Sequence, residues 1–353
     1  MSITSKTVFV SLAIIAATPV AARDGNHLKR EIPIPSEGSG FDYVTYSAGK
    51  LFIGHRAEGL QVVDLANGGK VSLVEKTKSS NGATVAPELD LGFSENGDGT
   101  VTVFKPSDLS VVEQIKVGEE LDSTRYDPTT KRLAVFGLPG KDKTSSKVAV
   151  YQMPERKRIG EIDAPSAKLE NSVVDGKGGV FVAAQDLNSI VRVDLGTLAI
   201  TASFAVPCKQ PTGLDYDKDG KRLMIGCRGA FTEPMFVVAN AETGDIVFKA
   251  PTSPGNDGVA YDAARKRVYV TNGIGAHLIV FEQANPDTYT LNEVIGTRPM
   301  AKTIALDPAT GDLFSIAAEP VFDATKKNLA YIAPYYPNGF TKNTFSVLQY
   351  GRP

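Results

Sequence analysis

The chain has 353 residues and a nearly balanced charge, with 38 Lys and Arg against 40 Asp and Glu. Hydrophobic residues make up 42% of it and charged residues 22%, which suits a folded protein with a sizeable core and disfavours nucleic acid as a partner. Two cysteines are too few for a structural four-cysteine zinc site, and no C-x-x-C-H string is present for covalent haem attachment.

The N-terminal segment has the pattern of a secretory signal peptide. Lys6 is its only charged residue, and an apolar run over residues 7–17 follows, with small residues just before Arg23. The run is too short to span a bilayer, and no polar face alternates with it as in a buried helix. We therefore predict a signal peptide over residues 1–22, cut before Arg23, and a periplasmic or secreted protein without a transmembrane segment.

A strand-turn-strand unit recurs along the mature chain. In its clearest copy, Asp257-Gly258-Val259-Ala260-Tyr261-Asp262 is the first strand, a polar turn follows, and a second strand covers residues 267–272. Successive copies are 41 to 47 residues apart. In chain order, the copies lie at residues 42–55, 81–96, 122–137, 170–184, 212–227, 257–272 and 302–317.

Each pair of strands is followed by two more. Residues 191–194 and 200–206 are examples of such third and fourth strands, with Gly, Asp and Pro between the strands of a copy. Four short strands repeating roughly every 44 residues are typical of a propeller blade. The sequence therefore predicts an all-β fold: one seven-bladed β-propeller of four-stranded antiparallel blades in residues 23–353.

The ends of the chain indicate how the ring closes. The last copy has a third strand at residues 345–350 but no fourth, whereas residues 28–34 resemble a fourth strand and precede the first copy. We expect residues 28–34 to become the outer strand of the last blade, because this pairs an otherwise open edge.

One copy carries a family signature. Its second strand contains Tyr269-Val270-Thr271-Asn272, and the chain resembles the YVTN-repeat, YncE-like family of exported bacterial seven-bladed propellers over nearly all of residues 28–351. The fourth copy departs from the signature with residues 183–185, and the first ends in Gly54-His55. The resemblance implies the fold and says little about activity. Further agreeing segments are residues 85–89, 92–93, 96–104, 211–214 and 305–308.

Candidate functional residues lie in the loops expected around one mouth of the central channel. The loops entering the inner strands and those joining the second and third strands share one face of a propeller, and here they are polar and mostly acidic or amide. The candidate ligand-binding residues are Asp42, His55, Arg56, Asn81, Glu88, Asn96, Asp122, Glu170, Gln185, Arg228, Asp257, Asn272 and Glu319.

Two interpretations of this set remain open. Glu88, Asp257 and His55 are candidates to hold a divalent cation, since hard cations prefer oxygen ligands and imidazole is a common ligand. Alternatively, Asp and Asn at repeated positions fix tight turns through side-chain to backbone hydrogen bonds. His55 is an imidazole on this face, so it is also the candidate general base, and His277 in a loop between strands is a second imidazole that could join it.

Two further features concern the fifth and seventh copies. Cys208 precedes the inner strand of the fifth copy and Cys227 ends its second strand, so export predicts a disulfide between them. Residues 319–343 interrupt the seventh copy and form either a lid over the channel mouth or a loop without a role.

Composition also limits the chemistry. The chain has no Trp and three His, which excludes quinone-dependent dehydrogenase propellers with Trp-bearing motifs and His-rich copper propellers. We predict a monomeric binding or scaffold protein whose loop face binds a protein, a peptide or a small polar ligand, with no certain cofactor. The alternative is a metal-dependent hydrolase, lactonase or lyase with a divalent cation at the channel mouth, so the sequence does not decide whether the chain is an enzyme.

Overall fold

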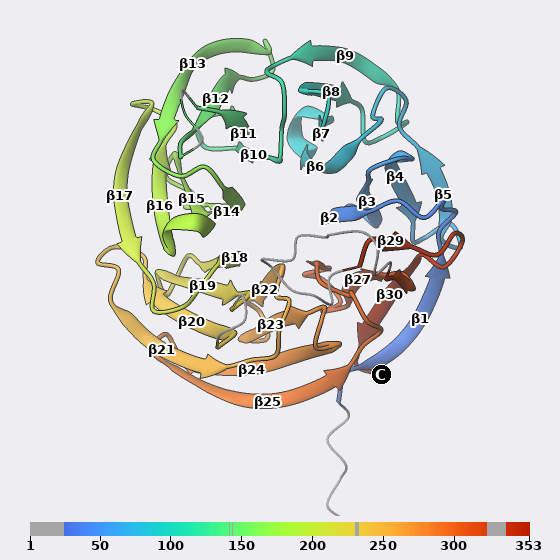
Figure 1. The fold of residues 1–353 in the computed structure, drawn as a ribbon, viewed down its shortest axis with the longest axis vertical. Coiled ribbons are helices and arrows are strands. Elements are labelled where there is room, and N and C mark those ends of the chain that lie inside the picture. Colours follow the sequence, from blue (N-terminus) through green and yellow to red (C-terminus); the bar gives the residue numbers. More distant parts are fainter. Residues whose placement is uncertain (1–24, 141, 143, 230–232, 323–336) are drawn as a thin grey trace, which may run out of the picture.

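The computed structural model describes residues 25–140, 142, 144–229, 233–322 and 337–353, which form an all-β ring of seven four-stranded antiparallel sheets. Figure 1 looks down the ring and shows the blades following one another around a central axis in chain order. The predicted seven-bladed propeller is confirmed. The predicted signal peptide lies outside the described residues.

The first six blades each consist of four consecutive strands. Blade 1 contains β2 (Phe41–Ser47), β3 (Lys50–His55), β4 (Gly59–Asp64) and β5 (Lys70–Leu73). Blade 2 contains β6 (Ser80–Ala86), β7 (Leu91–Asn96), β8 (Thr100–Phe104) and β9 (Val111–Lys116). Blade 3 contains β10 (Ser123–Asp127), β11 (Arg132–Pro139), β12 (Ser146–Gln152) and β13 (Lys157–Ala164). Blade 4 contains β14 (Leu169–Val174), β15 (Gly179–Ala184), β16 (Ser189–Asp194) and β17 (Ala199–Ala205). Blade 5 contains β18 (Pro211–Asp217), β19 (Arg222–Cys227), β20 (Met235–Asn240) and β21 (Ile246–Pro251). Blade 6 contains β22 (Gly258–Asp262), β23 (Arg267–Asn272), β24 (His277–Asn285) and β25 (Thr288–Gly296).

Blade 7 is built from both ends of the chain. Its order is β26 (Ile304–Leu306), β27 (Leu313–Ala317), β30 (Ser346–Gly351) and β1 (His27–Pro33). β1 pairs antiparallel with β30, with Ile32 opposite Val347. The predicted closure by the N-terminal strand is therefore confirmed.

The segment predicted to interrupt blade 7 leaves it between β27 and β30. At its two ends, β28 (Pro320–Val321) and β29 (Gly339–Phe340) pair in a separate two-stranded sheet. Phe340 also donates its backbone N–H to the carbonyl oxygen of Gly38, at 3.2 Å. The predicted lid or loop role of this segment concerns mostly residues 323–336, which lie outside the described residues.

The strand that carries the family signature shows why each blade needs apolar residues on both faces. Side chains of a strand alternate between the two faces of its sheet. Val268 and Val270 of β23 pack in the core shared with blade 5, while Tyr269 packs in the core shared with blade 7. All three are at most 1% exposed, so the strand ties its blade to both neighbours.

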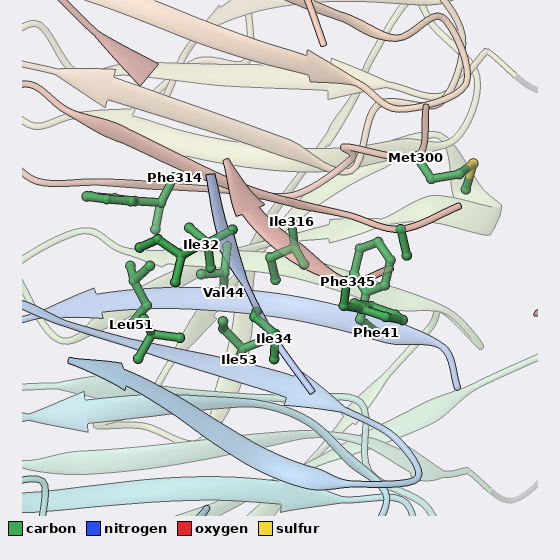
Figure 2. Packing of buried hydrophobic residues seen from close by; sticks show 14 residues of the cluster. Ile32, Ile34, Phe41, Val44, Leu51, Ile53, Met300, Phe314, Ile316 and Phe345 are labelled. Atoms are coloured by element: carbon green, nitrogen blue, oxygen red, sulfur yellow. The ribbon is translucent and has the colours of Figure 1, made fainter. Parts of the chain in front are cut away.

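The junction between blades 7 and 1 has the same construction. Ile32 and Ile34 lie in a cluster with Val44 of blade 1 and Phe314 of blade 7, and Figure 2 shows these side chains meeting between the two sheets. Ile32 is 4% exposed. The N-terminal strand thus supplies both backbone pairing and apolar side chains at the point where the ring closes.

Replacing Ile32 by Ala tests this closure. We expect Ile32→Ala to lower the free energy of unfolding by about 2–4 kcal/mol, because it removes buried methylene groups and leaves a cavity at the junction. Leu28→Ala is the matched control on the same strand, since Leu28 is 47% exposed, and it should cost less than about 0.5 kcal/mol. Urea unfolding measures both, and equal effects would contradict the closure described here.

Candidate functional site

The inner strands bring one repeat position of every blade to the same mouth of the channel. This position lies at, or within two residues of, the start of the inner strand, and most of its occupants are charged. The seven occupants are Asp42, Asn81, Asp122, Glu170, Thr212, Asp257 and Lys302.

Lys302 joins two of these carboxylates. Its Nζ lies 3.2 Å from Oδ1 of Asp42 in blade 1 and 2.5 Å from Oδ2 of Asp257 in blade 6. Oδ2 of Asp42 also accepts a hydrogen bond from Nη2 of Arg56, at 2.8 Å. The Lys302 side chain is 9% exposed, so this cation is buried between its two partners.

The pairing continues on the other side of Asp257. Nε of Arg228 donates to Oδ1 of Asp257 at 2.7 Å, and its Nη1 lies 3.9 Å from Oε1 of Glu170. Nζ of Lys168 lies 3.5 Å from the same Glu170 oxygen and 3.4 Å from Oδ1 of Asp122. Cations and carboxylates therefore alternate around the mouth. We call this set the charge ring: Arg56, Asp42, Lys302, Asp257, Arg228, Glu170, Lys168 and Asp122.

Tyr43 reaches across the mouth inside the charge ring. Its hydroxyl lies 3.5 Å from Oδ2 of Asp122 and 3.5 Å from Oε2 of Glu170, in blades 3 and 4. Burial, together with the neighbouring carboxylates, raises the pKa of Tyr43 well above its ordinary value. The phenol therefore stays neutral and serves as a hydrogen-bond donor to the ring.

Two carboxylates of the charge ring, Asp42 and Asp122, have pKa values shifted in opposite directions. Burial alone would raise the pKa of Asp42, but Lys302 and Arg56 outweigh it and hold the pKa at about 2. For Asp122, burial dominates and raises the pKa to about 6, with Lys168 opposing and Glu170 adding to the shift. Glu170 and Asp122 in turn raise the pKa of Lys168, so this lysine is charged at neutral pH.

His55 is placed in the structure as a packed side chain. It is 0% exposed, its ring centroid lies 4.1 Å from that of Phe345, and its Nδ1 is 2.8 Å from Oε1 of Gln61. Nε2 lies 3.3 Å from Oε2 of Glu58. Burial lowers the pKa of His55. The imidazole thus belongs to the junction of blades 1 and 7 and not to the charge ring.

Most of the amide candidates also have internal partners. Nδ2 of Asn96 donates to the hydroxyls of Thr100 and Thr102, at 3.0 Å each. Asn272 donates to the carbonyl oxygen of Val270 at 3.0 Å. Both amides are 0% exposed and stabilise local turns and strands, as the structural interpretation of the amides predicts.

The remaining candidates differ in their distance from the ring. Gln185 donates a hydrogen bond to Oε1 of Glu170 at 3.0 Å and so contacts a member of the charge ring. Asn81 donates to the carbonyl oxygen of Leu121 at 2.9 Å. Glu319 is exposed and its backbone N–H bonds the Thr344 hydroxyl, outside the charge ring.

Glu88 is not brought to this mouth. It lies in the short helix η1 (Pro87–Leu89), which joins β6 to β7, at the opposite ends of the strands from Asn81. There it interacts with Tyr126, whose pKa is raised by burial and by Glu88. Glu88, Asp257 and His55 therefore do not form a metal site together, and the described part of the chain contains no group of three or more His, Cys, Asp or Glu placed to hold a metal ion.

Turn-fixing carboxylates do occur, but at the other end of the blades. Asp262 ends β22 and accepts a hydrogen bond from the backbone N–H of Arg265 at 2.9 Å, and Asp127 does the same for Thr130 at 3.0 Å. The mouth carboxylates instead pair with cations. Repetition of Asp thus has a structural role at one face and an electrostatic one at the other.

The predicted disulfide joins Cys208 to Cys227 and is confirmed. Cys227 is the last residue of β19 and directly precedes Arg228. The covalent bond therefore fixes the chain next to the arginine that links Asp257 to Glu170.

Two members of this site, Lys168 and Tyr43, were not among the sequence candidates. Lys302 begins the seventh copy and shares its repeat position with Asp257, so its place in a loop at the mouth could be predicted from the sequence. Lys168 stands two residues before Glu170, in a loop of variable length, and Tyr43 acts across the channel, so neither had a comparable signal.

The comparisons with known proteins bear on the fold. No protein-family model and no curated protein sequence matches the chain. Among solved structures, a chain of a mitotic checkpoint complex aligns with a TM-score of 0.70 at 14% identity, over 88% of this chain and 95% of that one. U3-55K aligns with a TM-score of 0.69 at 8% identity, over 90% of this chain and 97% of that one. Hydrazine synthase of Kuenenia stuttgartiensis aligns with a TM-score of 0.64 at 16% identity, over 80% of this chain and 94% of that one.

At these identities the likeness shows a propeller fold alone. Membership of the YVTN-repeat family stays a prediction from the sequence. A search of the described ranges for a helix long and apolar enough to cross a membrane finds none.

Asp42→Asn tests the electrostatics of the mouth. The pKa of Asp42 is about 2 in the folded state, below its ordinary value of 3.8, so its charge stabilises the fold above about pH 4 and this contribution is lost as the pH falls towards 2. We expect the variant to lose about 2 kcal/mol of unfolding free energy at pH 7. The deficit should shrink progressively below pH 4 in urea unfolding.

Asp122→Asn is the matched control of opposite sign. Because the pKa of Asp122 is raised to about 6, the wild type should gain stability relative to this variant as the pH falls from 7 towards 4. If both differences moved in the same direction with pH, the assignment of these two carboxylates would be wrong.

Proposed function

We propose that the chain is an exported, YncE-like binding propeller that holds a protein or peptide partner on the face of the charge ring. The observation that carries this proposal is the ring itself, in which residues from blades 1 and 3 to 7 place four cations and four carboxylates around one mouth. A fixed pattern of alternating charge selects partners and orients them. It does so whether or not the partner is an enzyme substrate.

The exposed side of the ring offers a place for an acidic side chain of the partner. A hollow of about 360 Å³ lies between Arg56 and Lys168, with Asn81, Glu120 and Asp122 in its wall. The Arg56 and Lys168 side chains are 55% and 48% exposed, so a carboxylate that entered the hollow would meet cations on both sides. We therefore expect the partner to present Asp or Glu at this point.

The fold is compatible with such a role. One structurally similar chain comes from a mitotic checkpoint complex, so a propeller of this shape is part of a protein assembly there. Export is supported by the disulfide between Cys208 and Cys227, because disulfides persist in oxidising compartments. The hydrolase alternative has less support, since its proposed ligands Glu88 and His55 lie away from Asp257.

A photo-crosslinking amino acid in place of Ala167, an exposed residue in the wall of the hollow, tests the proposal in the native cells. We expect one discrete adduct with a partner protein or peptide, which disappears at high salt because the contact is electrostatic. Lys168→Met should reduce the adduct at least about threefold, since it removes one of the two cations that flank the hollow.

Lys221→Met is the control for that experiment. Lys221 is 46% exposed and also ion-paired, 2.8 Å from Glu242, but it lies outside the mouth. Its loss should leave the adduct unchanged. No adduct from position 167, or an equal reduction by both lysine variants, would contradict binding at the charge ring.

A further inference from the structure

A cavity of about 240 Å³ lies in the central channel below the charge ring. Its wall is formed by all seven inner strands and runs from Tyr43 to Tyr46 along β2 and from Thr303 to Leu306 in blade 7. A single water needs only about 10–15 Å³ of such space. The cavity is therefore large enough for a small organic molecule.

Arg125 of β10 is the cationic side chain in this wall. Its Nε donates to Oγ of Ser172 at 3.2 Å, and its Nη groups make no hydrogen bond to the described residues. No described carboxylate lies within 4.0 Å of the guanidinium, in contrast to the paired cations of the charge ring. A guanidinium has five N–H donors in a planar fork, so most of its binding capacity is unused here.

The equivalent positions of blades 1 and 2 show that the fold does not require a long charged side chain at position 125. Thr45 and Thr84 occupy them in blades 1 and 2, and each hydroxyl donates to a backbone carbonyl of the next blade at 2.7 Å. A short hydroxyl side chain is thus sufficient to bridge adjacent blades. Arg125 makes the same kind of bridge through Nε and places a charged fork in the channel as well.

Three acidic residues line the cavity with Arg125, and one of them, Asp257, is already paired with Lys302 and Arg228 at the mouth. Burial raises the pKa of Glu95 to about 8, and this residue is therefore mostly neutral at pH 7. Burial also raises the pKa of Asp215, to about 6, against the hydrogen bonds it accepts from the backbone N–H groups of Tyr261 and Tyr216, at 2.7 Å each. At pH 7 Arg125 and Asp215 are therefore a charged guanidinium and a charged carboxylate that share the cavity and form no ion pair with each other.

We propose that the channel cavity is a binding site for a small organic monocarboxylate, whose carboxyl group forms a bidentate pair with the Nη groups of Arg125. The planar fork matches a carboxylate in geometry. A single anionic charge fits one guanidinium, whereas a dianion such as phosphate would be repelled by Asp215. This inference goes beyond the proposed partner binding and does not depend on it.

The rest of the wall favours a hydroxy acid over a plain fatty acid. The hydroxyl oxygens of Ser123 and Thr303 have no hydrogen-bond partner among the described residues, and both residues line the cavity. A buried hydroxyl without a partner is costly, so a ligand hydroxyl nearby would be stabilising. Tyr43 crosses the charged mouth above the cavity, and the wall extends to Tyr46 and Leu306 near the far ends of their strands. We therefore infer entry from the face opposite the charge ring.

Titration of the purified protein with lactate and acetate, followed by ligand-observed NMR at pH 7.5, tests the proposal. We expect saturable binding in the millimolar range or tighter, with lactate binding more tightly than acetate. Arg125→Gln should weaken lactate binding at least about tenfold, because it removes the charge-assisted pair. Arg30→Gln, the same change on outer strand β1, should have no effect.

Asp215→Asn provides an independent measurement if Arg125→Gln does not fold. It removes the competing charge and keeps one of the two oxygens that accept backbone N–H groups, so lactate should bind several-fold more tightly. Lys168→Met at the charge ring should leave lactate binding unchanged, which separates this site from the proposed partner surface.

Three results would overturn the channel site. They are no saturable binding of either acid to the wild type, unchanged binding in a folded Arg125→Gln variant, and unchanged or weaker binding in Asp215→Asn. Inorganic phosphate binding more tightly than lactate would overturn the monocarboxylate assignment.

Discussion

Charges that are brought together at a crowded channel mouth must be paired, and this constraint shapes the whole candidate site. Burying an ion without a partner is costly, and loss of one member of a buried pair leaves the other uncompensated. Lys302 meets this requirement by lying between Asp42 and Asp257, two carboxylates from different blades. The pair with Asp42 connects the first and last blades of the chain, and the pair with Asp257 connects blade 7 to blade 6.

The apolar junctions make this arrangement possible. Each blade buries side chains on both faces, as Tyr269 and Val270 do on opposite sides of β23, so every blade is fixed by two neighbours. At the last junction, β1 supplies the missing strand and Ile32 completes the core. A closed ring then leaves a channel whose wall contains Arg125 and Asp215 on two different inner strands.

The fold could be predicted from the sequence because its signals are local and repeated. The period of the strand pairs, the missing fourth strand of the last copy and the spacing of Cys208 and Cys227 were sufficient for the blades, the closure and the disulfide. The site was predicted in part: its acidic residues came from loop positions, but their partners act across blades. His55 was expected at the mouth and lies instead against Phe345, because its direction depends on packing that repeats do not encode.

The central claim is that the mouth is one coupled network of charges. A double-mutant cycle with Asp257→Asn and Lys302→Met, read by urea unfolding at pH 7, measures the coupling directly. The contact of 2.5 Å and the burial of both side chains predict a coupling energy of at least about 1.5 kcal/mol. A coupling energy within about 0.3–0.5 kcal/mol of zero, the range of independent sites, would contradict the network.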